Sequence, residues 1–173
     1  MTTWRVMNAD VFDVKADGLI CSANPSLNLS GGVGGAFLLR YGNEMQDYLH
    51  RHLRDRNSHY VERGGVIIAP SCNSPFIAVA HAVAIDAFYE TNIGVICETY
   101  ERALNQLAKE NCRTVVASCL GCGYGRCPIN EFIAALKSVV ALSFPTVEVV
   151  TFATADSYLA EAITSGLASI SAD

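Results

Sequence analysis

The sequence has no apolar run long enough to cross a membrane and no excess of basic charge. Its 173 residues carry 12 Lys and Arg against 17 Asp and Glu, a net charge of −5 at pH 7. Proteins that bind extended nucleic acids use clustered Lys and Arg to displace counterions, so we expect no such binding. The N-terminal MTTWRVMNAD lacks the basic start and apolar core of a signal peptide. We therefore expect a cytoplasmic protein without a membrane partner.

The cysteines lack the spacing of a zinc site or a disulfide framework. There are seven, an odd number, and several stand inside apolar runs, where a reduced cysteine acts as a small apolar side chain. Cys119 and Cys122 form one Cys-x2-Cys pair. No second pair and no histidine follow at ligand spacing. We expect neither a metal nor a cofactor.

No internal repeat, low-complexity tract or linker divides the chain, so we expect one domain over residues 1–173. Apolar, β-branched runs alternate with amphipathic helical windows, which predicts an α/β fold. The expected strands are Trp4–Met7, Gly18–Ser22, Val66–Ala69, Phe76–Val83, Thr114–Ser118 and Val147–Phe152. The expected helices are Glu44–Arg54, Val95–Lys109, Glu131–Leu142 and Ser157–Thr164. These elements predict a three-layer α/β/α sandwich with a mixed central sheet of about six strands.

Glycine is concentrated in two short segments, and the first follows the second expected strand. The chain reads NPSLNLSGGVGGAF from Asn24 to Phe37, with an expected helix start at Ala36. Its glycines are Gly31, Gly32, Gly34 and Gly35. Glycines between a strand and a helix let a ligand approach bare backbone, and the N–H groups of the helix N-terminus suit a phosphate. A flexible turn is the alternative, and the spacing matches neither G-x-G-x-x-G nor the Walker motif.

The second glycine segment follows the fifth expected strand. CLGCGYGRCP, Cys119 to Pro128, has a glycine at positions 121, 123 and 125, and its proline suits the first turn of the next helix. In open α/β sheets, ligands bind beyond the carboxyl ends of the strands. The two glycine segments could therefore hold a pyrophosphate between them.

Five segments, in this order, resemble motifs of the macrodomain family, the ADP-ribose-binding modules. Asn8–Val11 (NADV) is similar to the opening Gly-Asp-Ile-Thr, and Asp17–Asn24 (DGLICSAN) is similar to Asp-x-Ile-Val-Asn-Ala-Ala-Asn. Residues 29–37 (LSGGVGGAF) resemble the glycine-rich first loop. Val79–Val83 (VAHAV) resembles the Ile-His-x-Val strand, and residues 121–128 (GCGYGRCP) resemble the second phosphate loop. The resemblance extends over nearly the whole chain.

The resemblance implies that the partner is ADP-ribose or an ADP-ribosylated macromolecule. Asp10 would accept a hydrogen bond from the adenine amino group, Phe152 would pack against the adenine, and Asn24 would hold the distal ribose. The glycine loops would wrap the diphosphate, and Tyr124 would close over the ligand. The implied ligand-binding residues are Asp10, Val11, Asn24, Gly31, Gly32, Val33, Gly34, Gly35, Ala36, Gly121, Cys122, Gly123, Tyr124, Gly125 and Phe152.

Four of these residues also have a structural interpretation that involves no ligand. Asp10 could cap a turn, and Asn24 could be a turn residue before Pro25. Tyr124 could be a surface residue, and Phe152 could belong to the core. Both interpretations of these residues stay open at the level of the sequence.

One departure from the family bears on catalysis. Many members that remove ADP-ribose carry an aspartate in Gly-Gly-Val-Asp-Gly, and Gly34 takes that place here. A positioned general base contributes about a hundred- to ten-thousandfold in rate. Asn24 is the remaining candidate for a catalytic role, whereas His81 lies in an apolar strand and Cys122 would need a lowered pKa.

Three functions stay open on the sequence. The chain could hydrolyse ADP-ribosyl adducts or O-acyl-ADP-ribose without the usual aspartate, or it could be a reader that only binds ADP-ribose. A nicotinamide-dependent oxidoreductase is a third possibility, but the G-x-G-x-x-G fingerprint is missing after the first strand.

Overall fold

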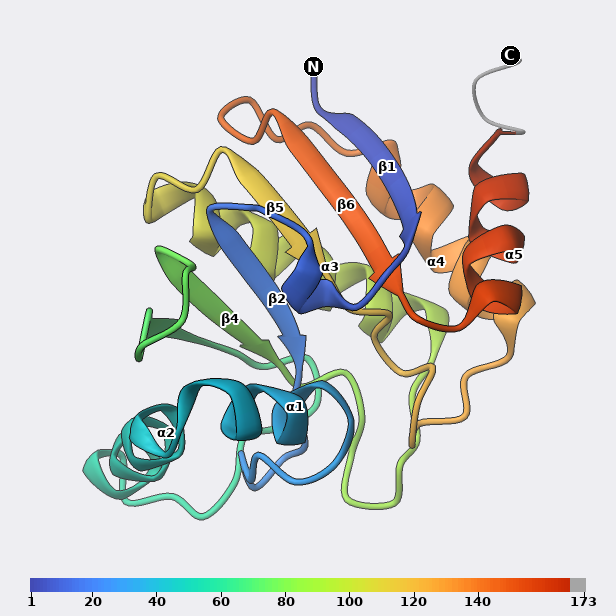
Figure 1. Ribbon diagram of the computed structural model, residues 1–173. Helices are drawn as coiled ribbons and strands as arrows, with labels where there is room; N and C mark the ends of the chain where they lie inside the picture. Colours follow the sequence, from blue (N-terminus) through green and yellow to red (C-terminus); the bar gives the residue numbers. More distant parts are fainter. Residues whose placement is uncertain (169–173) are drawn as a thin grey trace.

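A computed structural model of the protein describes residues 1–168, and residues 169–173 of the expected domain lie outside this part. Its centre is a six-stranded sheet in the order β1-β6-β5-β2-β4-β3 (Figure 1). The strands are β1 (Thr3–Asn8), β2 (Gly18–Ser22), β3 (Val66–Pro70), β4 (Ala78–Ala82), β5 (Thr114–Ala117) and β6 (Val149–Thr154). All neighbours are parallel except β3 and β4, which are antiparallel. The mixed sheet confirms the predicted fold class.

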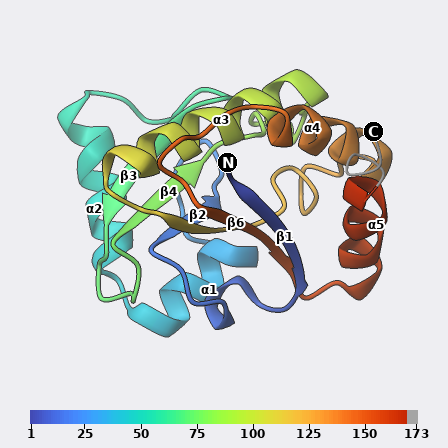
Figure 2. The ribbon, with the colours of Figure 1, turned by 90° about the horizontal axis from the view of Figure 1, so that it is seen from above.

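Helices cover both faces of the sheet. They are the 3₁₀ helix η1 (Val11–Asp13) and the α-helices α1 (Gly32–Tyr41), α2 (Glu44–Asp55), α3 (Ile93–Lys109), α4 (Ile129–Val140) and α5 (Ser157–Ala168). Figure 2 shows the sheet between α1 on one side and α3 and α4 on the other. Within residues 1–168, no helix is both long and apolar enough to cross a membrane.

Successive side chains of each strand point to opposite faces of the sheet, and this alternation produces two separate core layers. In β4, Val79 and Val83 just beyond its end face the layer under α1 and α2, whereas Ala80 and Ala82 face the layer under α3, α4 and α5. Every residue of β4 is buried, as expected for a strand with a neighbour on each side and helices on both faces. The central strands therefore hold their carboxyl ends at a fixed edge.

Several element boundaries differ by a few residues from the predictions, and two of these differences change the lining of this edge. The helix expected to begin at Ala36 begins at Gly32, because Phe37 is fully buried and Gly34 packs against the backbone of Leu29. The last strand ends at Thr154 and not at Phe152, since it pairs with β1 along its full length. Tertiary contacts here override the low helix propensity of glycine.

A buried hydrogen-bond network holds the end of β5. The hydroxyl of Tyr100 on α3 donates to the carbonyl of Ser118 (2.7 Å) and accepts from the N–H of Leu120 (3.0 Å). The Ser118 hydroxyl in turn donates to the Ile20 carbonyl and accepts from the Ser22 N–H on β2. These bonds join α3, β5 and β2 where the second glycine segment begins.

We expect Tyr100→Phe to lower the free energy of unfolding by about 1–3 kcal/mol, because two buried backbone groups lose their partner. Urea denaturation measures this change. Tyr158→Phe is the matched control, since the Tyr158 side chain is exposed on α5 and should not affect stability. A Tyr100→Phe protein as stable as the control would mean that the network does not contribute to the fold.

Candidate functional site

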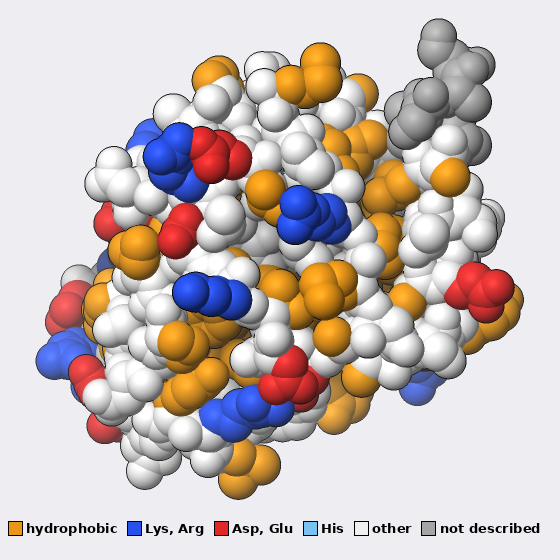
Figure 3. Space-filling view, turned by 45° about the horizontal axis from the view of Figure 1, so that its top comes forward, with side chains coloured by type: hydrophobic (Ala, Val, Ile, Leu, Met, Phe, Trp, Pro, Cys, Tyr) orange, Lys and Arg blue, Asp and Glu red, His pale blue; other side chains and the backbone are white. Residues whose placement is uncertain are grey.

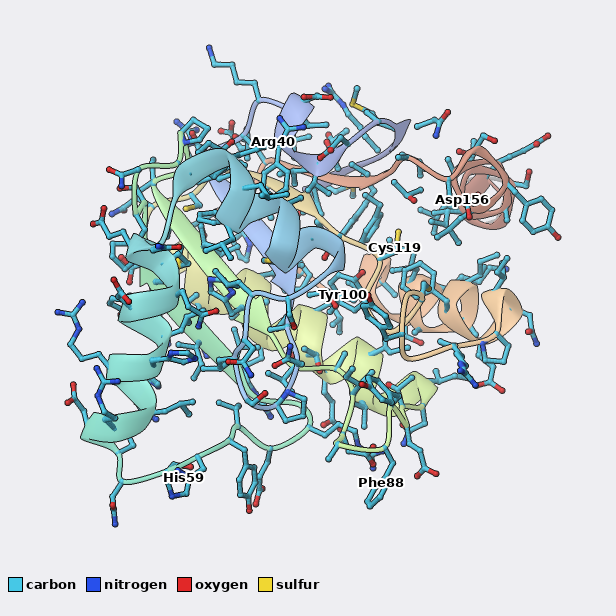
Figure 4. All side chains as sticks on the ribbon, turned by 60° about the horizontal axis from the view of Figure 1, so that its bottom comes forward. Arg40, His59, Phe88, Tyr100, Cys119 and Asp156 are labelled. Carbon is cyan, nitrogen blue, oxygen red and sulfur yellow. The ribbon has the colours of Figure 1, made fainter. Side chains whose placement is uncertain are left out.

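Five loops meet at the carboxyl edge of the parallel strands. Figure 4 views this edge, with Arg40 and Asp156 toward one end and His59 and Phe88 toward the other. The segment 57–65 joins them because β3, which it precedes, runs antiparallel to its neighbour. Its Val61 N–H donates to the Pro25 carbonyl (2.7 Å), and its Gly64 N–H donates to the Val83 carbonyl (2.7 Å).

A cavity of about 1380 Å³ lies between these loops. Among the residues implied to bind the ligand, those on its wall are Asp10, Val11, Asn24, Gly31, Gly32, Val33, Gly34, Ala36, Gly121, Cys122, Gly123, Tyr124 and Gly125. Gly35 and Phe152 do not line it. The fold thus brings segments about a hundred residues apart in sequence to one surface.

The first wall of the cavity is the N-terminus of α1. The helix has no side-chain cap, and its first backbone bond to the preceding loop is donated by Gly35 to the Gly31 carbonyl (2.9 Å). The N–H groups of Gly32, Val33 and Gly34 therefore have no partner within the helix. Gly31 and Gly32 have φ values of 65° and 52°, which favour glycine. This turn presents three backbone donors and the positive end of the helix dipole to the cavity.

The second wall is the loop after β5. Its internal hydrogen bonds are donated by the N–H groups of Cys122, Arg126 and Cys127. In the described part of the chain, the N–H groups of Gly123, Tyr124 and Gly125 donate to no acceptor. The loop therefore offers a second set of backbone donors opposite α1, an arrangement that suits an anion with oxygens on both sides.

Tyr124 connects the two walls. A methyl group placed on Gly31 would lie 2.5 Å from the Tyr124 hydroxyl oxygen, so the ring closely approaches the first loop. Its ring also lies 6.2 Å from that of Tyr89. Tyr124 is nonetheless mostly exposed, so one of its faces is open to solvent. Only glycine at position 31 permits this approach.

Asp10 lies at the β1 end of the cavity and already has two partners. Its carboxylate accepts the Phe12 N–H (3.0 Å), which caps η1, and pairs with the Arg40 guanidinium (3.1 Å). Arg40 also lies over the Phe12 ring, 5.1 Å from its centroid. The capping role considered for Asp10 is therefore present, and the remaining carboxylate lone pairs are those a ligand could use.

The Asn24 side chain is also used within its own loop. Its Oδ1 accepts from the Asn28 N–H (3.0 Å) and from the Ser26 hydroxyl (3.0 Å), and its Nδ2 donates to the Asn28 carbonyl (2.7 Å). This is the turn role considered for Asn24. The bonds fix the amide at the cavity wall and leave it one free N–H to donate.

Phe152 lies in the core, which differs from its implied contact with adenine. Its side chain is fully buried, its ring stacks on Trp4 at 5.8 Å, and it meets Tyr100 edge-on. The cavity is instead lined by the residues that follow it, Ala153 to Asp156. The predicted strand ended at Phe152, two residues before the observed end of β6, so the sequence analysis did not identify these lining residues.

Other wall residues absent from the prediction include Ser22, Tyr60, Ile85, Phe88, Tyr89, Ser118 and Cys119. Ser22, Ser118 and Ile85 come at or soon after the carboxyl ends of strands, and this position was an available signal. Tyr60 belongs to the segment 57–65, and only the antiparallel pairing of β3 brings it to this edge.

Burial keeps the histidine and two of the cysteines of the wall in their neutral forms. Burial lowers the pKa of His81 to about 4, and neither ring nitrogen has a hydrogen-bond partner. Burial raises the pKa of Cys119 to about 12 and raises the pKa of Cys122 even more. The thiols are therefore protonated and poor nucleophiles at neutral pH. Among residues 1–168, no three His, Cys, Asp or Glu side chains form a metal-binding group.

Comparison with known proteins identifies the family. The Macro domain family profile matches residues 20–136, which is more than half of the chain. The chain belongs to the Macro domain family. None of the curated proteins compared with this macrodomain matches its sequence.

Solved macrodomains share the fold at low sequence identity. A mutant Oceanobacillus iheyensis macrodomain with ADPR is 18% identical, with a TM-score of 0.89 over 99% of this chain and 95% of that chain. The same organism's macrodomain with ADP is 19% identical, with a TM-score of 0.86 over 95% and 90%. A Trypanosoma brucei macrodomain in complex with ADP-ribose is 16% identical, with a TM-score of 0.78 over 95% and 68%.

The buried His81 predicts acid sensitivity. Its pKa is lower in the folded protein than the ordinary 6.5, so between about pH 6.5 and 4 the unfolded chain binds a proton that the folded protein does not. The free energy of unfolding therefore falls as the pH is lowered through this range. When the pH is lowered from 7 to 4.5, we expect the free energy of unfolding to fall by about 2 kcal/mol more in wild type than in His81→Leu.

Urea denaturation at both pH values measures this difference. His59→Gln is the control, because His59 is exposed and its replacement should leave the acid sensitivity unchanged. Equal losses in wild type and His81→Leu would show that folding does not lower the pKa of His81.

Proposed function

We propose that this macrodomain binds ADP-ribose, free or attached to a macromolecule, and does not cleave it. The observation that carries the proposal is the pair of backbone donor sets, at the start of α1 and in the loop 119–125, that line one cavity. Backbone donors at a helix N-terminus and in a glycine loop bind phosphate without a charged side chain. Two of the similar solved macrodomains are complexes with ADPR or ADP-ribose, which supports this ligand.

Backbone donors matter here because the basic side chains at the cavity are already paired. Arg63 is the cation on its wall, and its guanidinium pairs with Asp86 (3.3 Å). Arg40, beside the β1 end, pairs with Asp10 and Asp13. Basic and acidic side chains are also interspersed on the face shown in Figure 3, which views the molecule from the side opposite the carboxyl edge. These features favour one diphosphate over a long phosphate backbone.

The order of the strands suggests how ADP-ribose would be oriented along the carboxyl edge. Asp10 and Asp156 lie at the β1–β6 end, where the adenine would bind, and the donor loops lie over β5 and β2. Asn24, at the end of β2 next to β4, would contact the distal ribose. The ligand would therefore run along the carboxyl edge from β1 toward β4.

A binding role without cleavage follows from the acid–base groups of the wall. Gly34 supplies no carboxylate, and three of the lining carboxylates are engaged: Asp10 and Asp86 in ion pairs, and Asp156 as a cap for the Leu159 N–H. The fourth, Glu62, is exposed at the rim. The thiols are protonated and His81 is a buried neutral ring, so residues 1–168 place no base where the distal ribose would lie.

Titration calorimetry with ADP-ribose should give one site per chain, and absence of heat together with absence of competition would reject the proposal.

Gly123→Val should weaken binding by about tenfold or more, because the new side chain stands beside the free amides. A Cβ at Gly123 would meet no atom within 4 Å, so the fold accommodates the change. Ser138→Val, exposed on α4, is the control and should bind like wild type.

Cleavage is tested with a panel of substrates. The protein is incubated with mono-ADP-ribosylated protein, ADP-ribosylated nucleic acid and O-acetyl-ADP-ribose, and released ADP-ribose is measured. We expect release at the rate of buffer alone in every case. Faster release from any substrate, lost again in Gly123→Val, would make the protein a hydrolase.

A further inference from the structure

Three exposed aromatic side chains stand at the β4–β3 end of the cavity. Phe88 is 83% exposed, Tyr60 is 58% exposed and Tyr89 is 54% exposed, and all three line the same cavity as the donor loops. We call them the aromatic rim. Exposed aromatics that adjoin a binding cavity mark an interaction surface more often than isolated ones do.

The loop that carries Phe88 is held in place by hydrogen bonds. The Asp86 carboxylate accepts the N–H groups of Phe88 (2.9 Å) and Glu90 (3.0 Å), and the Asp86 N–H donates to the Glu90 carbonyl (3.1 Å). Arg63 pairs with Asp86 and also donates to the Glu90 carbonyl (3.2 Å). Tyr89 takes a positive φ of 64°, which is unusual for a bulky residue. The Phe88 ring is therefore presented to solvent by an ordered turn, which lowers the entropy lost on binding.

The rim lies where a group attached to ADP-ribose would emerge. The proposed ligand runs from Asp10 at the β1 end to Asn24 beside β4, and an adduct is joined through its distal ribose. Figure 4 places Phe88 at the end of the edge opposite Arg40 and Asp156. The cavity of about 1380 Å³ is also larger than the roughly 300–1000 Å³ of a typical small-molecule pocket.

The charges of the rim favour one class of adduct. Glu62 lines this end of the cavity, and Glu90 and Glu131 adjoin it. Among the described residues, the Lys and Arg side chains here are Arg63, which forms an ion pair with Asp86, and Arg126, so acidic groups are in excess. Together with a net charge of −5, this disfavours a phosphodiester chain and favours a positively charged one. Tyr and Phe rings bind apolar side chains and also the cations of Lys and Arg.

We propose that the rim recognises the protein part of an ADP-ribosylated protein, as a peptide segment with apolar and basic side chains next to the modified residue. This inference rests on the proposed function and names the partner of the same site. It makes the protein a reader of modified protein rather than of modified nucleic acid.

The experiment compares free ADP-ribose with an ADP-ribosylated peptide that has Leu, Lys and Arg beside the modified residue. We expect the peptide to bind about tenfold more tightly than free ADP-ribose, and Phe88→Ala to abolish this gain while free ADP-ribose still binds within about twofold of wild type. Tyr158→Ala is the matched control, because Tyr158 is also a highly exposed aromatic residue but lies on α5 and does not line the cavity. The same peptide with Asp and Ser at the flanking positions should bind no better than free ADP-ribose.

The outcomes separate this inference from the proposed function. If free ADP-ribose does not bind, the proposed function itself fails. If it binds but the peptide shows no gain, or Phe88→Ala weakens both ligands equally, only the rim proposal fails. An ADP-ribosylated oligonucleotide that binds more tightly than the peptide, with a gain lost in Phe88→Ala, would overturn the assignment to protein partners.

Discussion

The site depends on unpaired backbone N–H groups at two facing turns. A helix cannot satisfy its first three amides internally, and α1 begins on glycines that supply no capping side chain. The loop after β5 leaves another set of amides free on the opposite side. Both sets are fixed by the sheet beneath them, so the donors are in place before a ligand arrives. Such preorganisation favours an anion over water, which must reorient around it.

The core explains why these turns hold their positions. The Tyr100 hydroxyl binds backbone groups on both sides of Cys119, and Ser118 joins β5 to β2. Phe152 contributes from inside, because its ring packs between Trp4 and Tyr100 and so links β1 to α3. A residue first considered as a ligand contact thus acts on the site through the core that supports it.

The polar side chains of the wall mostly shape the loops. Asp10 caps η1, Asn24 closes the turn 24–28, and Asp86 orders the turn that carries Phe88. Because each of these groups is engaged, none of them is a free base next to the donor loops. At the aromatic rim, an ordered turn likewise holds the Phe88 ring outward. The proposed binding without cleavage and the proposed peptide recognition would therefore have a common structural origin.

The sequence by itself determined the layers and predicted which edge carries the site. Apolar runs predicted the strands, helical periodicity predicted α2 and α3, and glycines after two strands predicted a ligand at the carboxyl edge, where the cavity lies. These signals are local, since a residue's neighbours in sequence determine its face and its turn chemistry. The tertiary structure alone decided that the helix begins at Gly32, that β6 continues to Thr154 and that Phe152 is buried. It alone brought Tyr124 against Gly31 and added the segment 57–65 to the cavity. These features depend on contacts between distant parts of the chain, which no local pattern of residues encodes.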